Sequence, residues 1–296
     1  MHENDSLADR FVAHRAHLNA VACRMLGSLS EAEDAVQEAW LRLSRVDTGE
    51  IDNLGGWLTT TVGRVCLDML RSRKIRREEV FETHLPDPIV TTDDSTQPEQ
   101  QAVLTDSVGL ALLVVLDSLN PAERVTFVLH DMFAVPFDQI GPIIGRSGAA
   151  AKMMASRARR RVQGRAPRPD RDLPRQRLVV DAFLAAARGG EFEALLTILD
   201  PDVVLRADAG ALLPGGMRVL RGVAAVAGQL DTFHRAANAT VSHPVLINGL
   251  PGLLNTIESR TVSLLAFTIV DNKITAIDLL SDPARLPQHT PTPQAQ

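Results

Sequence analysis

The residues best suited to binding chemistry are a run of five cations near the middle of the chain: Lys152, Arg157, Arg159, Arg160 and Arg161. Guanidinium and ammonium groups at this spacing bind phosphate oxygens through charge-assisted hydrogen bonds. They end a segment in which isoleucines recur at helical spacing and small residues follow a break at Gly145. The segment from Phe137 to Gln163 therefore predicts two helices around a tight turn, with the cations on the second helix.

The residues after this turn indicate how such a pair of helices could read a nucleic acid. Ser147 is the expected N-cap of the second helix, because its side chain can accept a hydrogen bond from a free amide. Small residues such as Ala149 allow close approach to a base edge, and Lys152 projects from the helix. A helix-turn-helix unit places such a helix in the major groove while cations hold phosphates. An ordinary helical hairpin with a solvated basic face is the alternative.

A second group of cations lies earlier in the chain, on a helix predicted to follow Trp57. Five charged residues lie off the apolar side of that helix: Arg64, Asp68, Arg71, Arg73 and Lys74. Phosphate attraction combined with stacking on the indole suits single-stranded or distorted DNA. A core tryptophan beside a solvated charged face is the alternative.

A polar face is also predicted on the helix EAEDAVQEAWLRL, which Ser30 is expected to cap. Its apolar residues share one side, and the opposite side carries four polar residues: Asp34, Gln37, Glu38 and Arg42. Charge alone would make this an ordinary solvated surface.

The composition narrows the class of protein. A chain of 296 residues is long enough for two or three domains, and its net charge of −5 hides strong clustering. Cations gather at 64–77 and 152–168, and acids gather at 78–106. Cys23 and Cys66 have no metal-ligand spacing, the N-terminal residues are polar, and no apolar run reaches membrane-spanning length. We therefore expect a cytoplasmic protein without a metal, a cofactor or a membrane partner.

The residues after the Pro- and Arg-rich run at 165–175 change in character. Two helices are predicted at 177–187 and 191–199, followed by strands and a helix at 223–235. The strands are expected at 203–205, 217–220, 239–247, 253–257, 262–270 and 273–280, with a hairpin turn at Asp271-Asn272. This order predicts an α+β domain with a curved antiparallel sheet.

Three segments in this order resemble the extracytoplasmic-function (ECF) sigma factors of bacterial RNA polymerase. DAVQEAW and GWLTTTVGRVCLDMLR match region 2, and LNPAERVTFVLHDMFAVPFDQIGPIIGRSGAAAKMMASRARRRV matches region 4. The resemblance implies two all-α domains, region 2 at 1–78 and region 4 at 101–165, joined by an acidic linker at 79–100. It also implies core RNA polymerase and promoter DNA as partners.

The resemblance assigns roles to the polar faces. Contact with the clamp of the largest polymerase subunit falls to Asp34, Gln37, Glu38 and Arg42. Capture of the opened −10 element falls to Trp57, Arg64, Asp68, Arg71, Arg73 and Lys74, and reading of the −35 element to Ser147, Ala149, Lys152, Arg157 and Arg160. Region 4 is also expected to meet the flap of the second-largest subunit. Lys152 stands where the family often has arginine, which removes a bidentate contact.

The linker and the C-terminal part resemble a SigJ-like subgroup with an added SnoaL-like cone of the nuclear-transport-factor type. HLPDPIV is similar to its linker signature, with His84 in place of tryptophan, and SDPARL is similar to its C-terminal motif. The expected regulatory residues are His84, Pro86, Asp87, Pro88, Asp208 and Arg221. The cone would span 176–286, after a short linker at 166–175 and before a disordered tail at 287–296, and would regulate the sigma domains in cis. Composition alone favours an unstructured linker.

Two other classes of protein are open at this point. A DNA-binding repressor or activator could use the cone to sense a small molecule. A cone enzyme would need a paired acid and base, and the available groups are Asp208, Asp231, His234, His243 and Glu258. Their spacing picks out no pair, so no catalytic residue is assigned.

Overall fold

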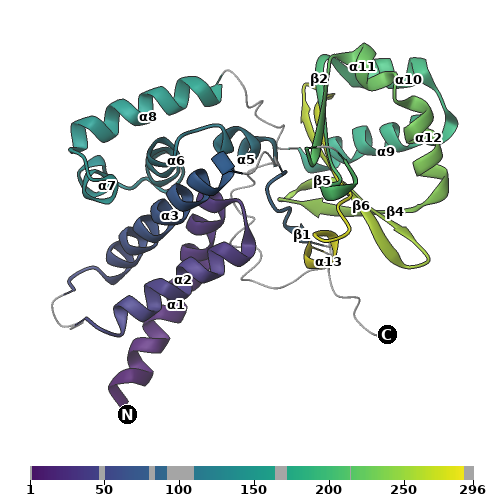
Figure 1. The fold of residues 1–296 in the computed structure, drawn as a ribbon. Coiled ribbons are helices and arrows are strands. Elements are labelled where there is room, and N and C mark those ends of the chain that lie inside the picture. The colour runs from purple at the N-terminus through teal and green to yellow at the C-terminus, as the bar shows by residue number, and fades with distance from the viewer. Residues whose placement is uncertain are drawn as a thin grey trace. The chain divides into compact units, whose positions relative to one another are not determined.

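The computed structural model describes residues 2–46, 51–79, 84–91, 110–163, 172–213 and 215–289 (Figure 1). The chain divides into two compact units. Among the described residues, the first unit holds those up to 79 together with 115–163, and the second holds 84–91, 110–114 and those from 172 onward.

The first unit begins with three helices, α1 (His2–Leu26), α2 (Leu29–Leu43) and α3 (Leu54–Glu79). Their shared core contains fully buried leucines and a methionine, including Leu18, Met25 and Leu58. Helix α2 starts earlier than expected, because the hydroxyl of Ser28 accepts from the Glu31 amide at 3.5 Å. Ser28 and not Ser30 is therefore its N-cap.

The next helix, α5 (Leu110–Asp117), is divided between the two units at Val114. The rest of the first unit is a run of helical segments: α6 (Pro121–Phe127), the π-helical turn Val128–Met132, α7 (Phe137–Ile144) and α8 (Gly148–Gln163). Asn120 and Glu123 form a reciprocal capping box in front of α6, with Pro121 at its first position. Helix α7 ends at Gly145, whose φ of 68° is the left-handed conformation that glycine adopts without strain. The predicted helix-turn-helix is confirmed.

Helix α3 packs against α6 and α7 within this unit. The approach is close at Gly63, where an added Cβ would lie 3.3 Å from a methyl of Leu129 and 3.5 Å from one of Ile143. Helix α3, which carries the cations between Arg64 and Lys74, therefore shares a core with the helix-turn-helix.

The second unit contains a seven-stranded sheet with helices packed on one side. These helices are α9 (Leu173–Gly189), α10 (Phe192–Ile198), α11 (Val223–Ala227) and α12 (Leu230–Ala239). A 3-10 turn lies at Gly210–Leu212, and the short helix α13 (Leu286–His289) follows the last strand and contacts β6. The strands are β1 (Val90–Thr91), β2 (Leu199–Asp208), β3 (Met217–Arg221), β4 (Val241–Ile247), β5 (Leu250–Ile257), β6 (Arg260–Val270) and β7 (Lys273–Leu280). Their order is β1-β4-β5-β6-β7-β2-β3.

The predicted fold class is confirmed, with corrections in detail. The sheet is mixed, because β2 pairs with β7 in parallel. The helix expected at 223–235 is interrupted at Gly228, and α9 begins at Leu173, inside the expected short linker. The first residues of the expected tail are helical in α13, and 290–296 lie outside the described residues.

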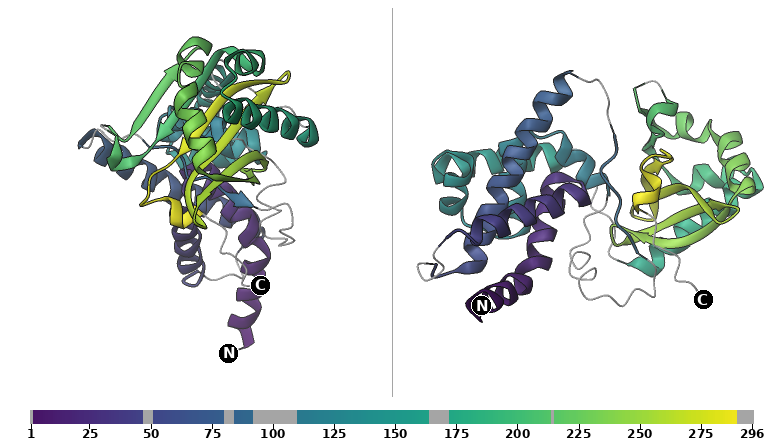
Figure 2. Two further views of the ribbon diagram at one scale, coloured as in Figure 1. Left: turned by 90° about the vertical axis from the view of Figure 1, so that its right-hand side faces the viewer. Right: turned by 60° about the horizontal axis from the view of Figure 1, so that its bottom comes forward.

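The two faces of the sheet have different partners (Figure 2). On one face, Phe183 of α9 packs with Phe267 of β6 and Ile277 of β7 in the main core of the unit. Alternation along the strands sends Arg206, Ala266 and Asp278 to the other face. Leu85, Pro86 and Pro88 of the linker lie over that second face, and Val90 and Thr91 join the edge of the sheet as β1.

Candidate functional sites on the two units

The polar face of α2 is exposed as the sequence predicts. Asp34 and Gln37 are exposed, while Glu38 and Arg42 are half-exposed and joined by a hydrogen bond of 2.9 Å. Beside it runs an apolar groove between α1 and α2 that sequence reasoning missed, lined by Phe11, Val12, Val36 and Trp40 and bordered by Gln37. Val12 is 60% exposed. Such a groove next to a polar face is a common form of protein-docking surface.

The charged face of α3 is mostly exposed, with one exception. Arg64, Asp68, Arg71 and Lys74 face solvent, and Trp57 is partly buried at the start of the helix. Arg73 instead donates to the carbonyl of Leu26 at 2.8 Å and forms an ion pair with Glu31. Arg73 therefore holds α3 to the neighbouring helices, which differs from the DNA-binding role expected for it.

The cations of α8 also fall into two groups. Lys152, Arg157 and Arg160 are exposed along with Ala149, and Ser147 accepts from the amide of Ala150 at 3.2 Å, which confirms the predicted cap. Arg159 pairs with Asp131 at 2.6 Å, and this hydrogen bond raises the pKa of the guanidinium. Arg161 pairs with Glu123 at 2.7 Å. Three of the cations thus remain facing solvent on the second helix of the motif.

In the second unit, the carboxylate of Asp208 at the end of β2 binds His84 and Leu85 of the linker. It is fully buried and accepts from the amide of Leu85 at 2.7 Å and from Arg285 at 2.6 Å. The ring Nδ1 of His84 lies 3.4 Å away, and the amide of Gly210 donates at 3.2 Å. A buried carboxylate needs several donors of this kind to offset its lost hydration.

Arg285 completes this arrangement, which we call the linker clamp (His84, Leu85, Asp87, Asp208 and Arg285). Its guanidinium donates to the carbonyl of Leu85 at 2.7 Å and to Asp87 at 2.6 Å, besides the bond to Asp208. Arg221, which was expected from the sequence to be a regulatory residue, is exposed on β3 and is not part of the clamp. Arg285 was not singled out from the sequence. The resemblance of SDPARL to a subgroup motif was the available signal.

The linker continues from the clamp into the sheet. Val90 and Thr91 form β1, which pairs antiparallel with Ile247 and Leu246 of β4. Beside it, Asn248 accepts from the amide of Ile89 through its side chain at 2.8 Å and donates to the Ile89 carbonyl from its backbone at 2.8 Å. The expectation of an unstructured linker is therefore wrong for residues 84–91, because their backbone is paired with the sheet.

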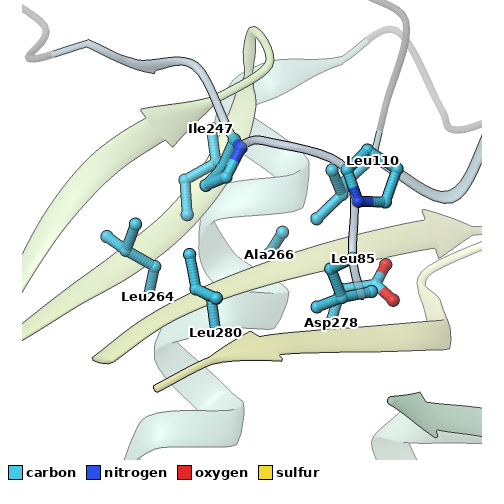
Figure 3. Close-up of a pocket in the computed structure, with 9 residues that line it drawn as sticks. Leu85, Leu110, Ile247, Leu264, Ala266, Asp278 and Leu280 are labelled. Carbon is cyan, nitrogen blue, oxygen red and sulfur yellow. The ribbon is translucent and has the colours of Figure 1, made fainter. Parts of the chain in front are cut away.

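Mostly apolar side chains line the space between the linker and the sheet (Figure 3). Leu85, Pro86 and Pro88 of the linker, together with Leu110, enclose a small cavity over the sheet residues Ile247, Leu264, Ala266, Asp278 and Leu280. Asp278 is buried and bonds to Arg206 at 2.7 Å. Burial raises the pKa of Asp278, and Arg206 opposes this.

The groups that an enzyme would need are separately engaged. Asp208 belongs to the linker clamp, His234 bonds to the carbonyl of Ala187 at 3.3 Å, and His243 bonds to the Thr256 hydroxyl at 3.0 Å. His243 and Glu258 line one groove at the ends of β4 to β6, and Asp231 lies on α12. In the described part of the chain, no cluster of three or more His, Cys, Asp or Glu side chains is arranged to hold a metal, and no helix is long and apolar enough to span a membrane.

Comparisons with known proteins cover nearly the whole chain. Residues 11–76 match the family model of Sigma-70 region 2. Over 291 residues, 97% of each chain, the sequence is 36% identical to the probable ECF RNA polymerase sigma factor SigI of Mycobacterium tuberculosis. It is 43% identical to the ECF RNA polymerase sigma factor SigJ of the same organism over 216 residues, which are 72% of this chain and 68% of the relative. The crystal structure of SigJ aligns with a TM-score of 0.78 at 33% identity, covering 96% of this chain and 99% of that one.

Proposed function

The chain belongs to the ECF RNA polymerase sigma factors of the SigJ-like type. We propose which partner each exposed face contacts during promoter recognition, and how the linker clamp regulates those contacts. A sigma factor directs transcription initiation after joining core RNA polymerase. The observation that carries the proposal is that the assigned residues of α2 and α8, and Arg64, Asp68, Arg71 and Lys74 of α3, are exposed or half-exposed, with Trp57 partly buried and Arg73 the exception.

The face of α2 binds the clamp of the largest polymerase subunit through Asp34, Gln37, Glu38 and Arg42. Its exposed carboxylates and amide on a rigid helix are suited to a basic partner surface. Region 4 meets the flap of the second-largest subunit. A pull-down of core polymerase by the purified protein tests the assignment, and the polymerase should be retained by the native chain and lost after charge reversal on α2.

Promoter DNA is contacted at two places in this proposal. Arg64, Arg71 and Lys74 of α3 hold phosphates of the opened −10 element beside Trp57. Ala149, Lys152, Arg157 and Arg160 of α8 enter the major groove at the −35 element, with Ser147 fixing the start of the helix. Recognition by the holoenzyme with no shift of promoter DNA by the sigma factor alone would separate this function from that of a conventional repressor or activator.

The C-terminal domain regulates these contacts in cis by holding the linker between regions 2 and 4. The clamp fixes Leu85 and Asp87, and β1 adds a strand to the sheet, so the domain limits how far the linker can extend. His84, Pro86 and Pro88 support this hold from the linker side. Release of residues 84–91 should change transcription from a dependent promoter. The protein acts in the cytoplasm, with the polymerase, and as a regulator without an enzymatic step.

A further inference from the structure

A polar cleft lies inside the first unit, between the helix α3 of region 2 and the helices of region 4. It has a volume of about 480 Å³ and is walled by Leu70, Arg73, Lys74, Asp117, Ser118, Leu119, Asn120, Pro121, Arg124 and Arg161. Four of these residues are cations and one is an acid. The cleft is distinct from the exposed cations assigned above to the −35 element, because Lys152, Arg157 and Arg160 do not line it.

Arg124 is the residue that makes the cleft unusual. Its side chain is 3% exposed and forms an ion pair with Asp117 through Nη1. Its Nε and Nη2 are buried and have no hydrogen-bond partner among the described residues. A buried guanidinium with unused donors is costly, and an acceptor in the cleft would satisfy it.

The other cations can converge on the same acceptor from both walls. Lys74 is exposed on α3, and the side chain of Arg161 on α8 is 52% exposed despite its bond to Glu123. Asp117 is already engaged by Arg124, so it opposes an incoming anion less than an unpaired carboxylate would. Guanidinium pairs joined by an ammonium suit a phosphate group, whose oxygens accept several charge-assisted hydrogen bonds at once.

We propose that this cleft binds the phosphate group of a small molecule and thereby stabilises the packing of region 2 against region 4. Both walls contribute donors, Lys74 from region 2 and Arg124 and Arg161 from region 4. The ligand therefore binds only while α3 stays packed on α6 and α7. The consequence for transcription rests on the proposed function: a bound phosphate compound opposes separation of the two DNA-binding regions. The binding itself does not depend on that function.

Titration calorimetry of the full-length free protein with inorganic pyrophosphate, at low ionic strength, tests the proposal. One equivalent should bind, and Lys74→Gln combined with Arg161→Gln should raise the Kd at least about tenfold, because two charge-assisted hydrogen bonds to the ligand are lost. Arg146→Gln, which removes an exposed arginine of the same unit outside the cleft, should leave the Kd unchanged. Arg161→Gln removes the cation that pairs with the buried Glu123 carboxylate but leaves an amide that can donate to it, and circular dichroism with urea unfolding verifies that both variants fold.

Absence of pyrophosphate binding by the native protein would overturn the proposal. Equal weakening by the Arg146 control would also overturn it, since the binding would then follow net charge. A short single-stranded oligonucleotide provides the third arm: if it displaces pyrophosphate through Lys74 and Arg161, the cleft is part of a DNA path and not a small-molecule site. A failure to bind core polymerase would leave all three results standing and would count only against the proposed function.

Discussion

The carboxylate of Asp208 and the guanidinium of Arg285 lie 2.6 Å apart although 77 positions separate them in the chain. Both also bind the backbone of Leu85, Asp208 at its amide and Arg285 at its carbonyl. The end of β2, the turn after β7 and the linker are therefore joined at one residue. This contact is the centre of the linker clamp.

Replacement of Arg285 by alanine should release the linker and weaken the second unit. It leaves a fully buried carboxylate without its cation, and breaking such a pair should lower the free energy of unfolding by about 2–4 kcal/mol. Urea unfolding measures the loss, and faster hydrogen exchange at the Leu85 and Ile89 amides would locate it. Arg221→Ala is the matched control and should change neither, because Arg221 is exposed. Unchanged exchange in the Arg285 variant would contradict the clamp.

Charge reversal on α2 should separate polymerase binding from folding. Asp34→Lys combined with Glu38→Lys changes only exposed or half-exposed side chains, so stability should move by about 0.5 kcal/mol or less per site. Retention of core polymerase in a pull-down should be lost. Glu193→Lys, an exposed reversal on α10, is the control that should bind normally. Normal binding by the α2 variant would reject the docking assignment.

Lys152→Ala should weaken promoter recognition at the −35 element. A direct base contact predicts a loss of about 1–3 kcal/mol on the cognate sequence and relaxed preference at one position. A phosphate contact predicts an equal loss on every sequence, with a shallower salt dependence. Holoenzyme binding to a set of −35 variants at two salt concentrations decides between them. The assignment of α8 fails if neither affinity nor salt dependence changes.

His17 should make the first unit less stable in mild acid. Its ring lies edge-on to Phe133 and 3.3 Å from the Thr59 hydroxyl, and burial, with His14 and Arg24 nearby, lowers its pKa below the ordinary 6.5. The unfolded chain therefore binds this proton more readily, so the stabilisation is complete above pH 6.5 and is lost as pH falls towards the folded pKa. Urea midpoints between pH 8 and 5 measure this, and His17→Gln should flatten the slope. If the urea midpoint of the His17→Gln variant depended on pH as steeply as that of the native protein, another group would be the cause of the pH dependence.

A large side chain at Gly63 should force α3 away from the helix-turn-helix. Leucine there would overlap Leu129 and Ile143, and overpacking of this kind costs about 1–3 kcal/mol. Thermal unfolding should shift downward, and small-angle scattering should show a larger radius of gyration if the regions separate. Ser72→Leu places the same side chain on the exposed side of α3 and should alter neither. An unchanged unfolding midpoint in the Gly63 variant would show that the contact can relax.

Sequence patterns predicted those elements whose signals are local. The strands β4 to β7 and the helix-turn-helix follow from alternation, helical spacing and the Gly145-Arg146-Ser147 break. The expected exposure of Asp34 and Lys152 also follows from helical spacing. Contacts between distant residues could not be predicted this way. Neither the docking of Leu85 on Asp208, across 123 positions, nor the pairing of Arg73 with Glu31 leaves a periodic signal.

The use of Arg285 in the linker clamp shows the same limit. Several arginines follow Asp208 in the chain, and the position of the turn after β7 determines that Arg285 is the one that reaches it. The mixed sheet has a similar cause, because the parallel pairing of β2 with β7 joins strands far apart in sequence. Local sequence propensity indicates which secondary structure a segment forms, but it does not indicate which distant segment packs against it.

Strand β1 covers an edge that is otherwise open. Among the described residues, β4 has β5 on one side and this linker segment on the other. Departure of the linker therefore frees the Asn248 amide, which donates to Ile89, and opens the edge of β4 at Leu246 to any extended chain. The state in which the linker has left the sheet is therefore also the state most prone to self-association. Recapture of its own strand competes with that association, and association gains over recapture as the protein concentration rises.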